Sequence, residues 1–68
     1  MRDFELRGDM IRLGQLLQAA GFADSGGHAK ALLSEAAVTV NGEPETRRGR
    51  QLHRGDVVAV AGESVRLV

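Results

Sequence analysis

The chain has 68 residues and no cysteine, so it has room for one small domain and cannot form disulfides or cysteine-based metal sites. Nine basic and nine acidic side chains cancel, and 43% of the residues are hydrophobic, which is typical of a folded domain rather than a disordered segment. No apolar run approaches the roughly 20 residues that cross a bilayer, and no signal peptide is visible at the start. We therefore expect one cytoplasmic domain over residues 1–68.

The first half of the sequence predicts one strand and two helices. Phe4 and Leu6 alternate with charged neighbours, which indicates a short strand over about residues 3–7. Apolar residues then recur at spacings of three, four and seven, which predicts helices near residues 12–20 and 25–35. We expect the two helices to pack through six apolar side chains, namely Leu13, Leu16, Leu17, Ala29, Leu32 and Leu33.

The second half predicts several short strands. Val38 and Val40 alternate with Thr39 and are followed by Asn41-Gly42, which is a strong hairpin signal. Pro44 cannot donate a ladder hydrogen bond, so the segment after the turn cannot be a central strand. Further strands are expected near residues 57–60 and 64–68. A strand, two helices and then several strands predict an α+β fold.

Charge is unevenly distributed along the chain. Residues 1–46 carry four basic and seven acidic side chains, whereas residues 47–68 carry five basic and two acidic ones. Three of the arginines, Arg47, Arg48 and Arg50, cluster where Pro44 and Gly49 indicate an irregular loop. Such a loop can direct guanidinium groups toward phosphates, although a solvated turn would have the same composition.

Other polar residues have both a structural and a functional interpretation. Ser25 fits an N-cap, and Asn41 fits a turn residue. Lys30, the only lysine, would be a fourth phosphate contact if it lay beside the arginine cluster. His28 and His53 are 25 residues apart with no metal-ligand pattern, and no nucleophile elbow is present. We therefore expect no metal, no cofactor and no enzymatic activity.

These residues resemble a known family, the S-four-type RNA-binding domain first named for a small-subunit ribosomal protein. The resemblance rests on a capped helix with an apolar pair and on the strand and turn Val38–Gly42. It is closer still to short stand-alone bacterial members of the YbcJ type, and it covers nearly the whole chain. Those members share the following segments: Phe4-x-Leu6, Ile11–Leu17, Asp24–Gly27 and Val40–Arg48.

The resemblance implies a fold in which two helices, the alpha-L RNA-binding motif, pack against a small, mostly antiparallel sheet. It implies an RNA surface along the second helix and the following loop. Carried onto this chain, with the turn residue Asn41 and the nearby Arg54, the candidate RNA-binding residues are Ser25, His28, Lys30, Asn41, Arg47, Arg48, Arg50 and Arg54.

The chain also departs from the family pattern at three positions. Ala36 stands where the family usually has a helix-ending glycine, so we expect a strained or altered helix exit. Thr39 and Gly49 stand where relatives often carry basic residues, and we expect these differences to weaken binding.

We interpret the chain as a small, non-enzymatic, monomeric protein that clamps the phosphate backbone of structured RNA, with ribosomal RNA and tRNA as candidates. Arg12 and Arg54 are candidate outer contacts. The chain has no Trp or Tyr, and we expect Phe4 and Phe22 in the core, so base-stacking platforms are missing. The alternative is a protein-interaction module whose arginine loop binds an acidic partner, which the zero net charge favours.

Overall fold

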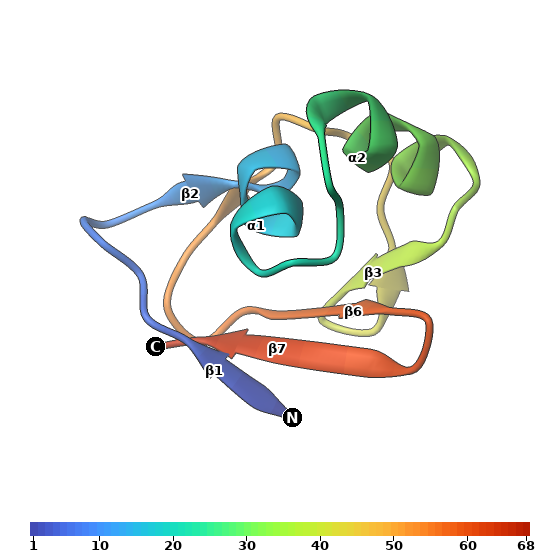
Figure 1. The fold of residues 1–68 in the computed structure, drawn as a ribbon. Coiled ribbons are helices and arrows are strands. Elements are labelled where there is room, and N and C mark those ends of the chain that lie inside the picture. Colours follow the sequence, from blue (N-terminus) through green and yellow to red (C-terminus); the bar gives the residue numbers. More distant parts are fainter.

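The computed structural model describes all residues, 1–68. Two helices follow two short N-terminal strands, and five more strands complete the chain (Figure 1). In chain order the elements are β1 (Arg2–Phe4), β2 (Ile11–Arg12), α1 (Leu13–Ala19), α2 (Gly26–Ser34), β3 (Val38–Val40), β4 (Glu43–Pro44), β5 (Gln51–Leu52), β6 (Val57–Val60) and β7 (Glu63–Leu67).

The main sheet has five strands in the order β1-β7-β6-β3-β4. Only the β1–β7 pair is parallel, and it places the first and last strands of the chain side by side, with the N- and C-termini at opposite ends of the pair (Figure 1). The other neighbours are antiparallel, and β2 and β5 form a separate antiparallel pair. The expected α+β fold, with two helices packed against a small, mostly antiparallel sheet, is confirmed.

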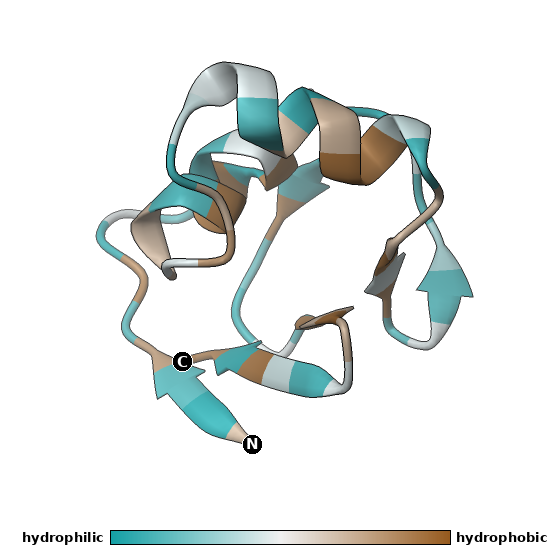
Figure 2. Ribbon diagram, turned by 45° about the vertical axis from the view of Figure 1, so that its right-hand side comes forward, coloured by the Kyte–Doolittle hydropathy of each residue, from teal (hydrophilic) through white to brown (hydrophobic).

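The core lies between the helices and one face of the sheet. Figure 2 shows the hydrophobic residues of both helices turned toward the sheet. The residues with no exposed surface include Leu13, Leu16 and Leu17 of α1, which belong to one buried cluster with valines of the sheet such as Val58. The apolar spacing of α1 therefore corresponds to a buried face, as the sequence predicted.

Three expectations about apolar residues hold only in part: the first strand is shorter than expected, and three side chains pack against the core without being fully buried. The first strand ends at Phe4 rather than near residue 7, although Leu6 N–H still donates to Val68 O at 2.9 Å before the chain crosses to β2. Phe4 and Phe22 are only partly buried, and Phe22 lies 5.5 Å below the guanidinium of Arg2. Leu32 is also partly buried, so Leu33 and Ala29 carry the packing of α2.

The Asn41-Gly42 turn explains the pairing of β3 with β4. Asn41 and Gly42 both have positive φ, 53° and 85°, and they join Val40 to its partner Glu43. Two such residues make a type I′ turn, which matches the twist of a hairpin. Pro44 lies on β4 at the edge of the sheet, where its missing N–H is tolerated, as expected.

The end of α2 is built with a strained alanine. Ala36 has a φ of 56°, in the left-handed region that glycine usually occupies. Its N–H donates to Leu33 O, and the next N–H, of Ala37, donates to Leu32 O. This is a Schellman ending with alanine at the glycine position. The strained helix exit expected from the sequence is therefore present.

Candidate nucleic-acid interface

The segment of residues 45–50, here called the arginine loop, is anchored to the start of α1. The N–H of Leu13 donates to Arg50 O at 2.8 Å, and the N–H of Gly14 donates to Arg48 O at 2.9 Å. The first N–H groups of a helix have no partner within the helix, so the loop satisfies two groups that would otherwise be exposed. The loop therefore has a fixed position against α1, although it has no regular structure of its own.

Gly14 allows this close approach. A Cβ atom at Gly14 would lie 2.5 Å from Cγ and 3.2 Å from Cδ of Arg48. The stem of Arg48 thus packs directly on the helix backbone. Glycine stabilises a helix less than alanine does, but at position 14 the missing side chain leaves room for the stem of Arg48.

The loop folds around the carboxylate of Glu45, which is almost fully buried. Its Oε2 accepts from the backbone N–H groups of Thr46 and Arg47. Its Oε1 accepts from Nη2 of Arg47 at 2.9 Å and from Nη1 of Arg50 at 3.1 Å. The side chain and then the backbone of Arg47 are the main causes that lower the pKa of Glu45 from 4.5 to about 2. Glu45 is therefore an anion at neutral pH and holds two arginines.

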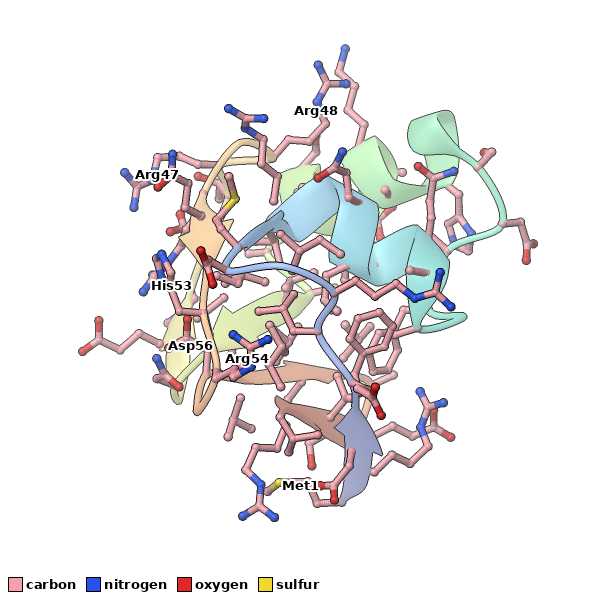
Figure 3. All side chains as sticks on the ribbon, turned by 90° about the vertical axis from the view of Figure 1, so that its left-hand side faces the viewer. Met1, Arg47, Arg48, His53, Arg54 and Asp56 are labelled. Atoms are coloured by element: carbon pink, nitrogen blue, oxygen red, sulfur yellow. The ribbon has the colours of Figure 1, made fainter.

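The three arginines of the loop consequently differ. Arg47 and Arg50 are both paired with Glu45, so their positive charge is partly neutralised. Arg48 is exposed and makes no ion pair. Figure 3 shows Arg47 and Arg48 at the end of the molecule opposite Met1. Arg12, at the start of α1, is likewise exposed and unpaired.

A groove of about 460 Å³ separates α1, the start of α2 and the arginine loop. It contains Arg12 and Arg48 and no acidic side chain. Its lining residues are Arg12, Gly14, Gln15, Gln18, Gly26, Ala29, Arg48 and Gly49. A second hollow adjoins it at Gly49 and is lined by Arg47, Gly49, Arg50, Gln51 and His53. Arginine side chains therefore line a hollow on each side of the loop.

The first turn of α2 is closed by its own side chains. Ser25 Oγ accepts from the N–H of His28, as an N-cap does, and Nδ1 of His28 accepts from the N–H of Asp24. Both side chains therefore have structural partners. Lys30 is exposed and does not line the groove, although it lies one helical turn after Gly26, which does. Its role beside the arginine loop stays a prediction.

Asn41 and Arg54 hold other parts of the fold together. Nδ2 of Asn41 donates to Asp56, and its Oδ1 accepts from the N–H of Val57. Burial raises the pKa of Asp56, but hydrogen bonds from His53 N–H and from Asn41 outweigh it and lower the value. Arg54 donates to backbone carbonyls of the β1–β2 segment, Leu6 O and Gly8 O. Neither residue lines the groove, and their roles in binding remain predictions.

Sequence reasoning missed three residues of this region. Gln15 and Gln18 line the groove, and their spacing of three places both on one face of α1. Glu45 was counted only as an acidic residue of the first 46, although it lies two positions before Arg47. The i, i+3 spacing of the glutamines, on the face of α1 away from its leucines, was the available signal.

No group of three or more His, Asp or Glu side chains is placed to hold a metal ion. No helix is long and apolar enough to span a membrane.

Comparisons with known proteins agree on one family. A family model described as the S4 domain matches residues 4–68. RlbA of Bacillus subtilis (strain 168) is 56% identical over 54 residues, which are 79% of this chain and 76% of RlbA. The name of that relative describes it as a probable ribosome maturation protein. YbcJ of Escherichia coli (strain K12), provisionally named an RNA-binding protein, is 38% identical over 58 residues, which are 85% of this chain and 83% of YbcJ.

A solved structure also matches over the full chain. The solution structure of YbcJ from E. coli superposes with a TM-score of 0.75 at 36% identity, covering 100% of this chain and 87% of YbcJ. That structure is described as revealing an αL motif involved in RNA binding. The S-four-type resemblance inferred from the sequence is confirmed.

Proposed function

Because this chain belongs to the S4 domain family, we propose that it is a non-enzymatic RNA-binding protein that holds the phosphate backbone of structured RNA. One observation carries the proposal: the two arginines that line the groove, Arg12 and Arg48, have no acidic partner. Their charge is therefore available for phosphates, although the net charge of the chain is zero. We treat residues 1–68 as one binding unit that acts as a monomer.

Arginine suits this task because its planar guanidinium donates two parallel hydrogen bonds to a phosphate. In the proposal Arg48 and Arg12 contact phosphates directly, and Lys30 adds a point charge beside the groove. Arg47 keeps an exposed side chain, 73% of its surface, while Glu45 fixes its direction. Arg50 is less exposed, 32%, so we assign it mainly to holding the loop. In this proposal the three loop arginines contribute unequally: Arg48 contributes most to phosphate binding and Arg50 least.

Structured RNA is favoured over single strands by the aromatic content. Single-strand binders stack successive bases on exposed aromatic rings. This chain has only two aromatic residues, Phe4 and Phe22, and both pack against the core. Shape, phosphates and 2′-hydroxyl groups then supply the recognition.

Ribosomal RNA and tRNA are the proposed targets. The name of RlbA links that relative to ribosome maturation, and 56% identity over most of both chains makes a shared target class the simplest expectation. Such a target also implies action in the cytoplasm.

Crosslinking in cells followed by sequencing of bound RNA tests this proposal. The control is the double variant Arg12→Ala, Arg48→Ala, which removes the two groove cations without touching the core. We expect the natural chain to recover ribosomal RNA or tRNA far above the control. Equal recovery of RNA from both chains would contradict the role of Arg12 and Arg48, and recovery of an acidic protein without RNA would favour the protein-partner alternative.

A further inference from the structure

Three glycines from three separate segments line the groove, and they are not equivalent. Gly14 is filled by the stem of Arg48, as described above. At Gly26 and Gly49, by contrast, an added Cβ would meet no atom within 4 Å. The missing side chains at these two positions therefore leave open space. The volume of the groove, about 460 Å³, falls in the range of roughly 300–1,000 Å³ that is usual for sites of small organic groups.

Two amide side chains face this space from α1. Oε1 of Gln15 accepts from the N–H of Arg12 at 3.1 Å, which orients the amide and leaves its NH₂ group free to donate. The side chain of Gln18 makes no hydrogen bond with the protein. Amides both donate and accept, whereas a phosphate only accepts. A pair of amides therefore matches the edge of a nucleobase better than it matches another phosphate.

The two arginines of the groove complete the match. Arg12 and Arg48 carry charge at the groove without a competing carboxylate, and they can bind the phosphates that flank one nucleotide. A guanidinium plane can also stack on a base. A paired base stays within the helical stack and cannot enter a groove, whereas an unpaired base can leave it.

We propose that the groove receives a single unpaired nucleotide of the bound RNA, with Gln15 and Gln18 reading its base and Arg12 and Arg48 holding its phosphates. This inference rests on the proposed function. It predicts that phosphate contacts give general affinity for structured RNA, while the groove adds a preference for RNA with a bulged or extruded nucleotide.

The test compares one fully paired hairpin stem with four otherwise identical hairpins, each of which carries a one-nucleotide bulge of a different base. The variant Gly26→Leu fills the groove, since the added Cβ at this position meets open space. Its matched control is Gly27→Leu, the next position of the same helix, which does not line the groove. Both changes replace glycine by a better helix former, and thermal melting checks that each variant folds.

We expect at least one bulged hairpin to bind about tenfold more tightly than the paired one, the size of one good base contact. Gly26→Leu should abolish this preference, so that bulged and paired hairpins bind it with equal affinity, and Gly27→Leu should keep the preference of the natural chain. Equal binding of every bulged hairpin and the paired one would overturn the inference and leave the proposed function standing. Equal weakening of both RNAs by Gly26→Leu, or no effect of it, would also overturn the inference. Absence of binding to any hairpin at low salt would overturn the proposed function as well.

Discussion

Glu45 binds the side chain of Arg47 at two points: Oε1 accepts from Nη2 at 2.9 Å, and Oε2 accepts from Nε at 3.3 Å. This is the paired geometry that arginine would otherwise offer to a phosphate. An internal carboxylate thus occupies one edge of a guanidinium that the sequence alone assigns to RNA. The outer edge of Arg47 stays exposed, so Glu45 fixes the direction of this side chain and reduces its net charge.

The arginine loop should lose its ordered structure at acid pH, because protonation of Glu45 breaks its ion pairs with Arg47 and Arg50. Because this pKa is lowered from 4.5 to about 2, the stabilisation is complete above pH 4.5 and is lost as the pH falls toward 2. We expect the backbone amide signals of Thr46 and Arg47 in NMR spectra to titrate with a midpoint near pH 2. Glu45→Gln should remove this transition. A midpoint near 4.5 in the natural chain would show that Glu45 is not held by the arginines.

Replacing Ala36 by glycine should stabilise the protein. A left-handed conformation costs an L-residue about 1–2 kcal/mol, and glycine removes this strain. Glycine also raises the conformational entropy of the unfolded chain, which offsets part of the stabilisation. The net gain should be about 0.5–1 kcal/mol, which raises the melting temperature by roughly 2–8 °C in a domain of this size. Ala36 is exposed, so no packing is lost. Ala37→Gly, without a positive φ at that position, is the control and should lower the melting temperature.

The core can be tested at two leucines that the sequence treats alike. Leu16 has no exposed surface, whereas Leu32 is partly buried at the edge of the core. Leu16→Ala should cost about 2–5 kcal/mol, and Leu32→Ala clearly less, because less apolar surface and a smaller cavity are involved. Denaturant unfolding of both variants measures the difference. Equal losses would contradict the burial of these two side chains.

The contact between Gly14 and Arg48 predicts an effect on RNA binding without any change of charge. The Cβ of Gly14→Ala would force the stem of Arg48 to move, so affinity for a hairpin RNA should fall about tenfold, as for the loss of one charge-assisted hydrogen bond. In an Arg48→Ala background the same substitution should have no further effect. Additive losses in this double-mutant cycle would mean that Gly14 acts independently of Arg48.

The local elements of this fold could be predicted because their signals are local. The helices expected at 12–20 and 25–35 are present as α1, Leu13–Ala19, and α2, Gly26–Ser34. The Asn41-Gly42 turn and the edge position of Pro44 also follow from the residues themselves. The parallel pairing of β1 with β7 joins the two ends of the chain, and no local pattern encodes such a contact.

The candidate site was less predictable, because spacing does not say which arginine meets which acid in an irregular loop. Glu45, Arg47 and Arg50 follow neither helical nor strand periodicity, so their ion pairs depend on how the loop folds against α1. The same contact with α1 sends Arg48 into the groove beside Arg12. The individual contributions of Ser25, His28, Lys30 and Asn41 to binding stay predictions.

The dependence of RNA affinity on salt tests the central proposal most directly. About four phosphate contacts, from Arg12, Lys30, Arg47 and Arg48, should give a slope of log affinity against log salt between about −3 and −4 in an anisotropy titration of a hairpin RNA. Arg48→Ala should make this slope less steep by about one unit. Arg66→Ala removes the same charge from a residue paired with Asp3, outside the groove, and should leave the slope unchanged. An affinity independent of salt, or equal slopes for the natural chain and Arg48→Ala, would contradict the account.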